Sequence, residues 1–185
     1  MSHSFNDVVQ LAYQGLRAAG IGHDASADTS LFLALAEADG LASHGLARVA
    51  QYAGHAKHGR VNPQAKAKVY QYKAASALVD GQDGLAFPAI KLATDLSVRL
   101  AKAHGVGLVA IKNTHHFGVA GHFTEAAARA GYVSILLGNT PAAMPMAGGK
   151  KALFGTNPLA AAFPVDGQDP LVIDMSLSAD RKSVV

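Results

Sequence analysis

Two adjacent histidines, His115 and His116, are the residues of this sequence best suited to proton chemistry. They lie in the segment 113–118, Asn-Thr-His-His-Phe-Gly, directly after the apolar run 106–111. Neutral imidazole is the side chain that most readily passes a proton near pH 7. We therefore expect one histidine of the pair to be a catalytic acid or base. The alternative is a histidine that is only hydrogen-bonded to loop carbonyls.

The same pair together with His122 has a second reading as a set of metal ligands. Neighbouring side chains on an extended backbone point in different directions, which disfavours a shared metal. We expect no metal site, with ligands from distant parts of the sequence as the open alternative. The absence of cysteine excludes zinc-thiolate sites, disulfides and thiolate catalysis.

A second candidate group consists of Ser43, His44 and Arg48. Ser43 is a candidate N-cap for a helix that would place Arg48 in its first turn. The helix dipole slightly disfavours a cation at that end. Arg48 makes more sense there if its guanidinium binds a carboxylate in a bidentate manner. The alternatives are a solvated surface arginine and a serine that acts only as a cap.

A third group lies at the ends of two later apolar runs, at Thr140 and at Asp174 to Ser176. If the strands before Asn113, Asn139 and Asp174 are neighbours in one sheet, His116, Thr140 and Asp174 meet at one edge. Asp174 is then able to orient a histidine, and the hydroxyls of Thr140 and Ser176 are able to bind a cofactor. The alternative is ordinary strand-end punctuation, in which Asn, Thr, Asp and Ser are common.

The elements that would position these residues fall into an N-terminal helical region, residues 1–65, and an α/β region, residues 66–185. Helical spacing of apolar residues predicts three helices in the first region, over 5–16, around 31–38 after Asp28 or Thr29 as cap, and from Leu46 to Gly59. In the second region we expect strands at 69–72 and 77–79, a turn at 80–84 and a helix from Pro88 to His104.

The run 106–111, the segment 119–130 and the run 132–137 then read as strand, helix and strand, a βαβ unit with a right-handed crossover. A long loop, 138–155, and strands at 159–165 and 171–175 follow. The fold class is therefore α/β, a helical layer followed by a mixed sheet. The string Gly105-Val106-Gly107 through Ala110 is not a dinucleotide fingerprint, because it precedes a strand instead of opening a helix.

Composition limits the function classes. Half of the 185 residues are hydrophobic and the net charge is +3, without a basic run interleaved with aromatics. We therefore expect a compact soluble protein that binds neither nucleic acid nor membrane. The N-terminus lacks a signal-peptide pattern, so the expected compartment is the cytoplasm.

Five ordered segments resemble the malate/L-lactate dehydrogenase family, which lacks the usual Rossmann fold. They are 42–49 (ASHGLARV), 113–118 (NTHHFG), 138–141 (GNTP), 153–158 (LFGTNP) and 172–176 (VIDMS). The resemblance covers about residues 5–178 and implies a non-Rossmann nicotinamide-cofactor fold. It also implies hydride transfer between NAD or NADP and a 2-hydroxy or 2-oxo acid of the malate, lactate or sulfolactate type. The family also contains reductases of cyclic ketimines such as Δ1-pyrroline-2-carboxylate, which is the alternative activity.

The resemblance further assigns roles to individual residues. His116 corresponds to the histidine that exchanges the substrate hydroxyl proton, and Arg48 to the residue that binds the substrate carboxylate. His44 corresponds to a proton donor in the reductase members, with Ser43 and Asp174 as relay partners. Which histidine is the main acid or base stays open between His116 and His44. Cofactor-contacting positions correspond to Thr140, Thr156, Asn157, Asp174, Met175 and Ser176.

One departure from the family lies at the C-terminus. Family members are considerably longer, whereas this sequence reads Ser178-Ala179-Asp180-Arg181-Lys182 and ends at Val185. We therefore expect a C-terminally truncated member with an incomplete fold, for which an inactive fragment is a further alternative. The resemblance implies a homodimer for the full-length protein.

Overall fold

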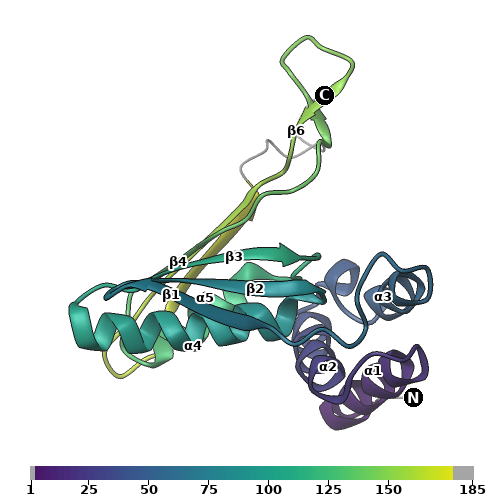
Figure 1. Cartoon of the computed structure of the whole chain (residues 1–185), viewed down its shortest axis with the longest axis horizontal. Helices are drawn as coiled ribbons and strands as arrows, with labels where there is room; N and C mark the ends of the chain where they lie inside the picture. The colour runs from purple at the N-terminus through teal and green to yellow at the C-terminus, as the bar shows by residue number, and fades with distance from the viewer. Residues whose placement is uncertain (1–2, 177–185) are drawn as a thin grey trace. The chain divides into compact units, whose positions relative to one another are not determined.

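The computed structural model describes residues 3–176 of the chain, which forms two compact units, residues 1–119 and 120–185 (Figure 1). The expected division between residues 65 and 66 falls inside the first of these units. The departure from the family pattern at 178–185 lies outside the described residues.

The first unit begins with the expected helical layer. Its helices are α1 (Phe5–Ala18), α2 (His23–Ala38), the 3-10 helix η1 (Ala42–His44) and α3 (Ala47–Lys57). Helix α1 starts at a capping box, in which the Ser4 side chain and the Asp7 carboxylate each bond the other residue's backbone N–H. This layer places Ser43 and His44 on η1 and Arg48 near the start of α3.

The two caps expected for the later helices are wrong. Helix α2 starts at His23 after Gly22, so Asp28 and Thr29 lie inside the helix. Ser43 lies within η1, and α3 follows Leu46 without a side-chain cap of its own. The Glu37 carboxylate instead accepts a hydrogen bond from the Leu46 N–H, at 2.9 Å. A carboxylate from a neighbouring helix therefore replaces the local serine that the sequence pattern indicated.

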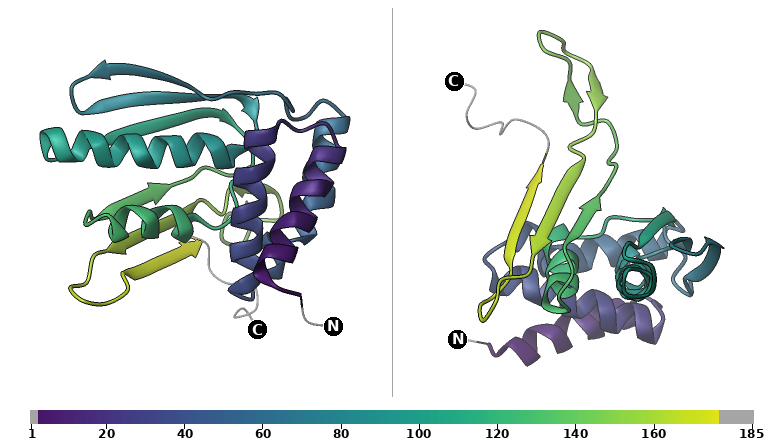
Figure 2. Two further views of the ribbon diagram at one scale, coloured as in Figure 1. Left: turned by 90° about the horizontal axis from the view of Figure 1, so that it is seen from below. Right: turned by 90° about the vertical axis from the view of Figure 1, so that its left-hand side faces the viewer.

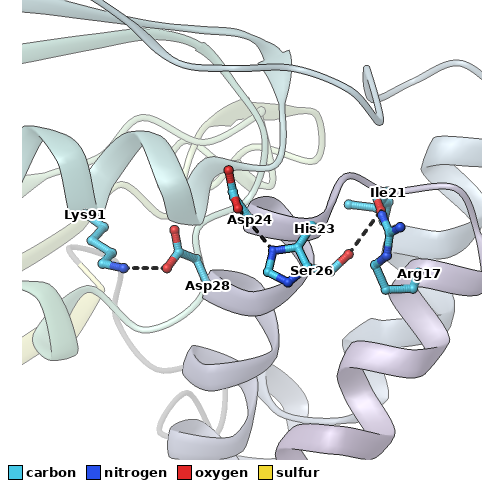
Figure 3. Close-up of polar contacts among 7 residues, drawn as sticks. All are labelled: Arg17, Ile21, His23, Asp24, Ser26, Asp28 and Lys91. Carbon is cyan, nitrogen blue, oxygen red and sulfur yellow. Dashed lines mark hydrogen bonds and ion pairs between the residues drawn. The ribbon is translucent and has the colours of Figure 1, made fainter.

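Polar contacts fix the start of α2 against its neighbours (Figure 3). The Ile21 carbonyl accepts hydrogen bonds from the Arg17 guanidinium and from the buried Ser26 hydroxyl. The Asp28 carboxylate forms an ion pair with Lys91 of helix α4 (Ala86–His104), with 2.6 Å between nitrogen and oxygen. Asp28 thus connects the helical layer to the helix that covers the sheet.

The sheet of the first unit is mixed, as expected. Strand β2 (Ser76–Gly84) lies between β1 (Lys68–Lys73), which is antiparallel to it, and β3 (Leu108–Thr114), which is parallel to it. Helix α4 connects β2 to β3 and packs along the sheet with Ala89 and Ala93 against Val79 (Figure 1). The βαβ unit of this protein is therefore β2–α4–β3.

Three expectations about this region are wrong. Residues 80–84 belong to β2 instead of forming a free turn, although Gln82 and Asp83 have left-handed backbone conformations. Pro88 is the third residue of α4, not its first. Strand β3 does not share a sheet with β4 (Ser134–Leu137), so the βαβ unit expected over 106–137 is not formed. Its second strand, β4, pairs instead with one antiparallel strand, β7 (Pro158–Phe163).

The second unit is a three-stranded antiparallel sheet with one helix. Strand β7 (Pro158–Phe163) lies between β4 and β8 (Leu171–Ser176), and α5 (Ala120–Arg129) packs on one face (Figure 2). The close packing requires Gly121, because a Cβ there would lie 3.2–3.3 Å from atoms of Val172 and Asp174. The long loop contains a short hairpin, β5 (Met144–Pro145) and β6 (Ala152–Phe154), which extends beyond the sheet (Figure 1).

None of the helices within residues 3–176 has both the length and the apolar character needed to span a membrane.

Candidate active site

The two histidines follow strand β3 and lie next to the helical layer of the first unit. The strand ends at Thr114, and the chain then turns through 115–118. Gly118 closes this turn with φ +73°, and a Cβ there would lie 3.0 Å from the Phe87 ring. Only glycine satisfies both the left-handed conformation and the close approach. The turn is thereby held against α4, and His115 and His116 face α3.

His116 is hydrogen-bonded to a residue that the sequence patterns did not single out. The Tyr52 hydroxyl of α3 lies 2.7 Å from His116 Nδ1, and the Gly118 N–H donates to the same nitrogen at 3.3 Å. Because a backbone N–H only donates, Nδ1 is an acceptor here and the neutral ring carries its proton on Nε2. Tyr52 is fully buried, and burial raises the pKa of its hydroxyl above the ordinary value of 10. The hydroxyl therefore stays protonated and orients the imidazole.

His116 is neutral over the physiological pH range. Burial lowers its pKa from the ordinary 6.5 to about 4, and the positive charge of Arg48 and the nearby His44 and His115 act in the same direction. An uncharged imidazole is the form that accepts a proton or hydrogen-bonds a carbonyl oxygen. The environment thus keeps His116 in a form that is useful for acid–base chemistry.

The residues of the second candidate group lie beside His116. The ring centroids of His44 and His116 are 5.6 Å apart, and the Ser43 hydroxyl lies 3.0 Å from His44 Nδ1. Arg48 donates from Nε to the Ser43 carbonyl and from Nη1 to the Gln51 side chain, each at 2.6 Å. These contacts leave N–H donors on the guanidinium for an anion. The arrangement brings together Ser43, His44, Arg48 and His116.

His115 has a separate partner, His55 of α3. The two ring centroids are 4.6 Å apart, and the Nδ1 atoms of both rings are buried without a hydrogen-bond partner. Burial is also the main reason why the pKa values of both rings are lowered, with Arg60 adding to the effect. Tyr52 and His55 follow Arg48 by four and seven residues, which is the spacing of one helix face. This helical spacing from Arg48 is the sequence pattern from which Tyr52 and His55 could have been predicted as site residues.

These lowered pKa values predict a dependence of stability on pH. Between about pH 6.5 and 4 the unfolded chain binds a proton at residue 116 and the folded chain does not. The free energy of unfolding should therefore fall as the pH is lowered through this window. Urea unfolding at pH 7 and pH 5 measures the fall, which should be smaller in His116→Asn. An equal fall in both proteins would contradict the assignment.

The candidate cofactor residues gather at one edge of the sheet in the second unit. The Thr140 N–H donates to Asn157 Oδ1 at 3.1 Å, the Asn157 N–H donates to Thr140 Oγ1 at 3.2 Å, and the hydroxyls of Thr140 and Thr156 are 3.1 Å apart. The Ser176 hydroxyl donates to the Thr156 carbonyl. This cluster brings Thr140 together with residues that lie 16 to 36 positions further along the sequence. It already uses part of their hydrogen-bonding capacity in holding the base of the hairpin.

Asp174 and Met175 lie on opposite faces of β8. Asp174 Oδ2 accepts a hydrogen bond from the Gly121 N–H at 2.7 Å, which places its negative charge at the N-terminus of α5. The Met175 side chain lies on the face away from α5 and is exposed. The single sheet edge expected for His116, Thr140 and Asp174 is not formed, because β3 belongs to the first sheet whereas β4 and β8 belong to the second.

Within residues 3–176, no three side chains of histidine, aspartate or glutamate are grouped as metal ligands. The side chains near His116 that do form a group are histidines, a tyrosine and an arginine. Their chemistry suits a small anion and a proton.

Comparison with known proteins gives consistent matches over most of the chain. Residues 3–183 match the sequence profile of a family described as malate/L-lactate dehydrogenase. A (2R)-3-sulfolactate dehydrogenase (NADP(+)) of Chromohalobacter salexigens is 45% identical over 175 residues, which are 95% of this chain and 52% of the relative. A Δ1-pyrroline-2-carboxylate/Δ1-piperideine-2-carboxylate reductase of Pseudomonas putida is 38% identical over 79% of this chain and 43% of the relative.

Solved structures agree with these matches. The malate dehydrogenase of Entamoeba histolytica superposes with a TM-score of 0.90 at 27% identity, over 97% of this chain and 50% of that protein. The sulfolactate dehydrogenase of Methanocaldococcus jannaschii gives a TM-score of 0.88 at 34% identity, over 95% and 51%. The chain thus spans about half the length of the relatives that it matches.

Proposed function

The chain belongs to the malate/L-lactate dehydrogenase family, and from this premise we propose that it transfers a hydride between NAD or NADP and a small 2-hydroxy or 2-oxo acid. The observation that carries the proposal is the neutral His116, hydrogen-bonded to Tyr52 and lying beside His44 and Arg48. Oxidising a hydroxy acid needs a proton acceptor for the hydroxyl and a cation for the carboxylate. Both are present in this group.

We assign the proton to His116 and the carboxylate to Arg48. In the oxidative direction a bare Nε2 of His116 takes the hydroxyl proton and the ring becomes imidazolium. In the reductive direction this imidazolium returns the proton to the keto oxygen as the hydride reaches the carbonyl carbon. The bare Nε2 requires the ring proton on Nδ1, so the ring must change from the tautomer that the Gly118 N–H favours. The Tyr52 hydroxyl is suited to both states, because it donates to a bare Nδ1 and accepts from a protonated one.

A bound anion would help this proton transfer. Burial lowers the pKa of His116, and the positive charge of Arg48 lowers it further. A substrate carboxylate on Arg48 offsets part of the charge of the guanidinium. The pKa of His116 then rises toward the operating pH, which is where acid–base catalysis is most efficient. We propose that substrate binding tunes the imidazole in this way.

We propose that the nicotinamide cofactor, which accepts or supplies the hydride when it is bound, is held by the hairpin-base cluster of the second unit. That cluster presents hydroxyl and amide groups of Thr140, Thr156, Asn157 and Ser176 to a polar ligand. The exposed Met175 offers an apolar surface to a flat ring. Asp174 contributes by holding the start of α5, and its expected role as relay partner of Ser43 and His44 remains part of the proposal.

Reduction of a cyclic ketimine is the second candidate. One relative carries the name of a Δ1-pyrroline-2-carboxylate/Δ1-piperideine-2-carboxylate reductase. Its substrate also carries a carboxylate next to the reduced carbon, so Arg48 would serve it equally. His44, which lies beside His116 and is bonded to Ser43, is the candidate donor in that reaction.

The experiment is a nicotinamide absorbance assay on the purified 185-residue protein. NADH and NADPH are each tested with oxaloacetate, pyruvate, 3-sulfopyruvate and Δ1-pyrroline-2-carboxylate. Turnover of an oxo acid in preference to the ketimine supports the proposal, and the reverse preference supports the second candidate. Thermal denaturation with each cofactor is measured in parallel, because a ligand bound by the native state raises its stability. If the protein shows no turnover and no thermal shift with either cofactor, both candidate functions are contradicted. That is the result expected of an inactive fragment.

We further propose that the protein acts as a cytoplasmic homodimer. The face of the second sheet away from α5 carries exposed apolar side chains, namely Ile135, Leu137, Phe163, Leu171, Ile173 and Met175. They expose on the order of 600 Å², near the ~800 Å² that each partner of a stable complex buries. A second copy packed sheet to sheet would cover this face. Light scattering of the protein and of Ile135→Asp should give a dimer and a monomer respectively.

A further inference from the structure

The backbone beside the candidate site is strained at three closely spaced residues. Gln82, Asp83 and Asn113 have φ values of 54°, 59° and 53°, in the left-handed region. The first two lie where the pairing of β2 with β3 shifts, between Asp80 and Gly84. Asn113 faces them on β3 and stands three residues before His116. Non-glycine residues in this conformation persist only when the surroundings hold them there.

The Asp80 carboxylate is the group that holds these segments together. Its side chain is nearly buried, with the residue 6% exposed. Oδ1 accepts from the Gln82 N–H at 3.0 Å and from Asn113 Nδ2 at 3.1 Å, and Oδ2 lies 3.3 Å from Lys112 Nζ. The hydrogen bond from Gln82 is the main cause that lowers the pKa of this carboxyl to about 2. Asp80 is therefore charged at physiological pH and bonded to both strands.

Glycine at position 81 makes this contact between the strands possible. A Cβ at residue 81 would lie 2.3 Å from Thr114 Cγ2 and 2.8 Å from the Asn113 carbonyl oxygen. The two backbones approach so closely that any side chain would separate them. The Asn113 amide thereby comes within reach of Asp80, and the direction in which the chain leaves β3 is set at this point.

We propose that Asp80 is a positioning residue for His116. Through Asn113 it selects the left-handed turn at the end of β3, and that turn directs the chain so that the imidazole meets the Tyr52 hydroxyl. Asparagine adopts the left-handed conformation more readily than most residues, and the hydrogen bond to Asp80 fixes it there. That Asp80 supports catalysis rests on the proposed function. That Asp80 positions the His116 ring does not depend on it.

The test follows the His116 ring by NMR during titration from pH 7.5 to 5. In the unmodified protein the ring should stay neutral throughout, because its pKa is about 4. In Asp80→Ala the ring should leave its half-buried position, and its titration midpoint should rise by about one pH unit or more toward the ordinary 6.5. Asp83→Asn is the matched control, since it removes an exposed carboxylate from the same bulge and should leave the midpoint unchanged.

Asn113→Ala keeps the proposal testable if Asp80→Ala does not fold. Asn113 is exposed, and its replacement breaks the same hydrogen bond from the other strand. The midpoint should rise as in Asp80→Ala, and the double variant should show no additional rise. An unchanged His116 midpoint in folded Asn113→Ala overturns the proposal. The measurement is a titration of the His116 ring, so its result does not depend on whether the dehydrogenase assay detects activity.

Discussion

Replacing His116 with alanine should lower the rate of oxo-acid reduction by about 10²- to 10⁴-fold, the usual contribution of a positioned acid or base. The loss should appear in kcat, because the imidazole acts on the reacting oxygen. The structure supports this expectation through the neutral state of the ring and its bond to Tyr52. Single-turnover kinetics with a saturating oxo acid measure it.

Two further variants, His44→Ala and Tyr52→Phe, test whether His116 itself transfers the proton. Tyr52→Phe leaves the imidazole in place without its hydroxyl partner, and we expect a loss of about fivefold, since one hydrogen bond contributes about 1 kcal/mol. His104, exposed in the last turn of α4, provides a matched histidine control whose replacement should have no effect. If His44→Ala lost more than His116→Ala, the roles of the two histidines would have to be exchanged.

Replacing Arg48 with methionine should lower kcat/KM by about 10²-fold or more, because truncating one partner of a close charged pair typically costs 2–5 kcal/mol. Most of the loss should appear in KM, since the guanidinium binds the carboxylate in both the ground state and the transition state. Arg48→Lys should recover only part of it, because an ammonium lacks the planar donor pair. Initial rates over a range of oxo-acid concentrations measure both changes.

A second readout separates binding from loss of structure in the Arg48 variant. Arg48 lowers the pKa of His116, so its replacement should raise the His116 midpoint in the same NMR titration. Arg99→Met, an exposed change on α4, is the matched control and should alter neither the kinetics nor the midpoint. An Arg48→Met protein with unchanged KM would show that the substrate carboxylate binds elsewhere.

Much of the local structure follows from the amino-acid sequence alone. Apolar spacing and glycine positions predicted α1, α3 and α4 to within a few residues, because local propensity and amphipathic burial decide where helices form. The start of α2 was predicted several residues too late. The association of Ser43, His44 and Arg48 was also readable, because the three lie within six residues of one another. The resemblance to the family, which the profile match confirms, depended on five short segments and needed no spatial information.

The pairing of the strands and the surroundings of His116 depend instead on packing between distant segments. Periodicity shows that 106–111 and 132–137 are strands, but it does not say which partners they take, and here they join different sheets. Tyr52 is 64 residues from His116 and Asp80 is 33 residues from Asn113. Such contacts form only when packing brings distant segments together, so no local pattern specifies them. The burial that keeps His116 neutral arises from the same packing.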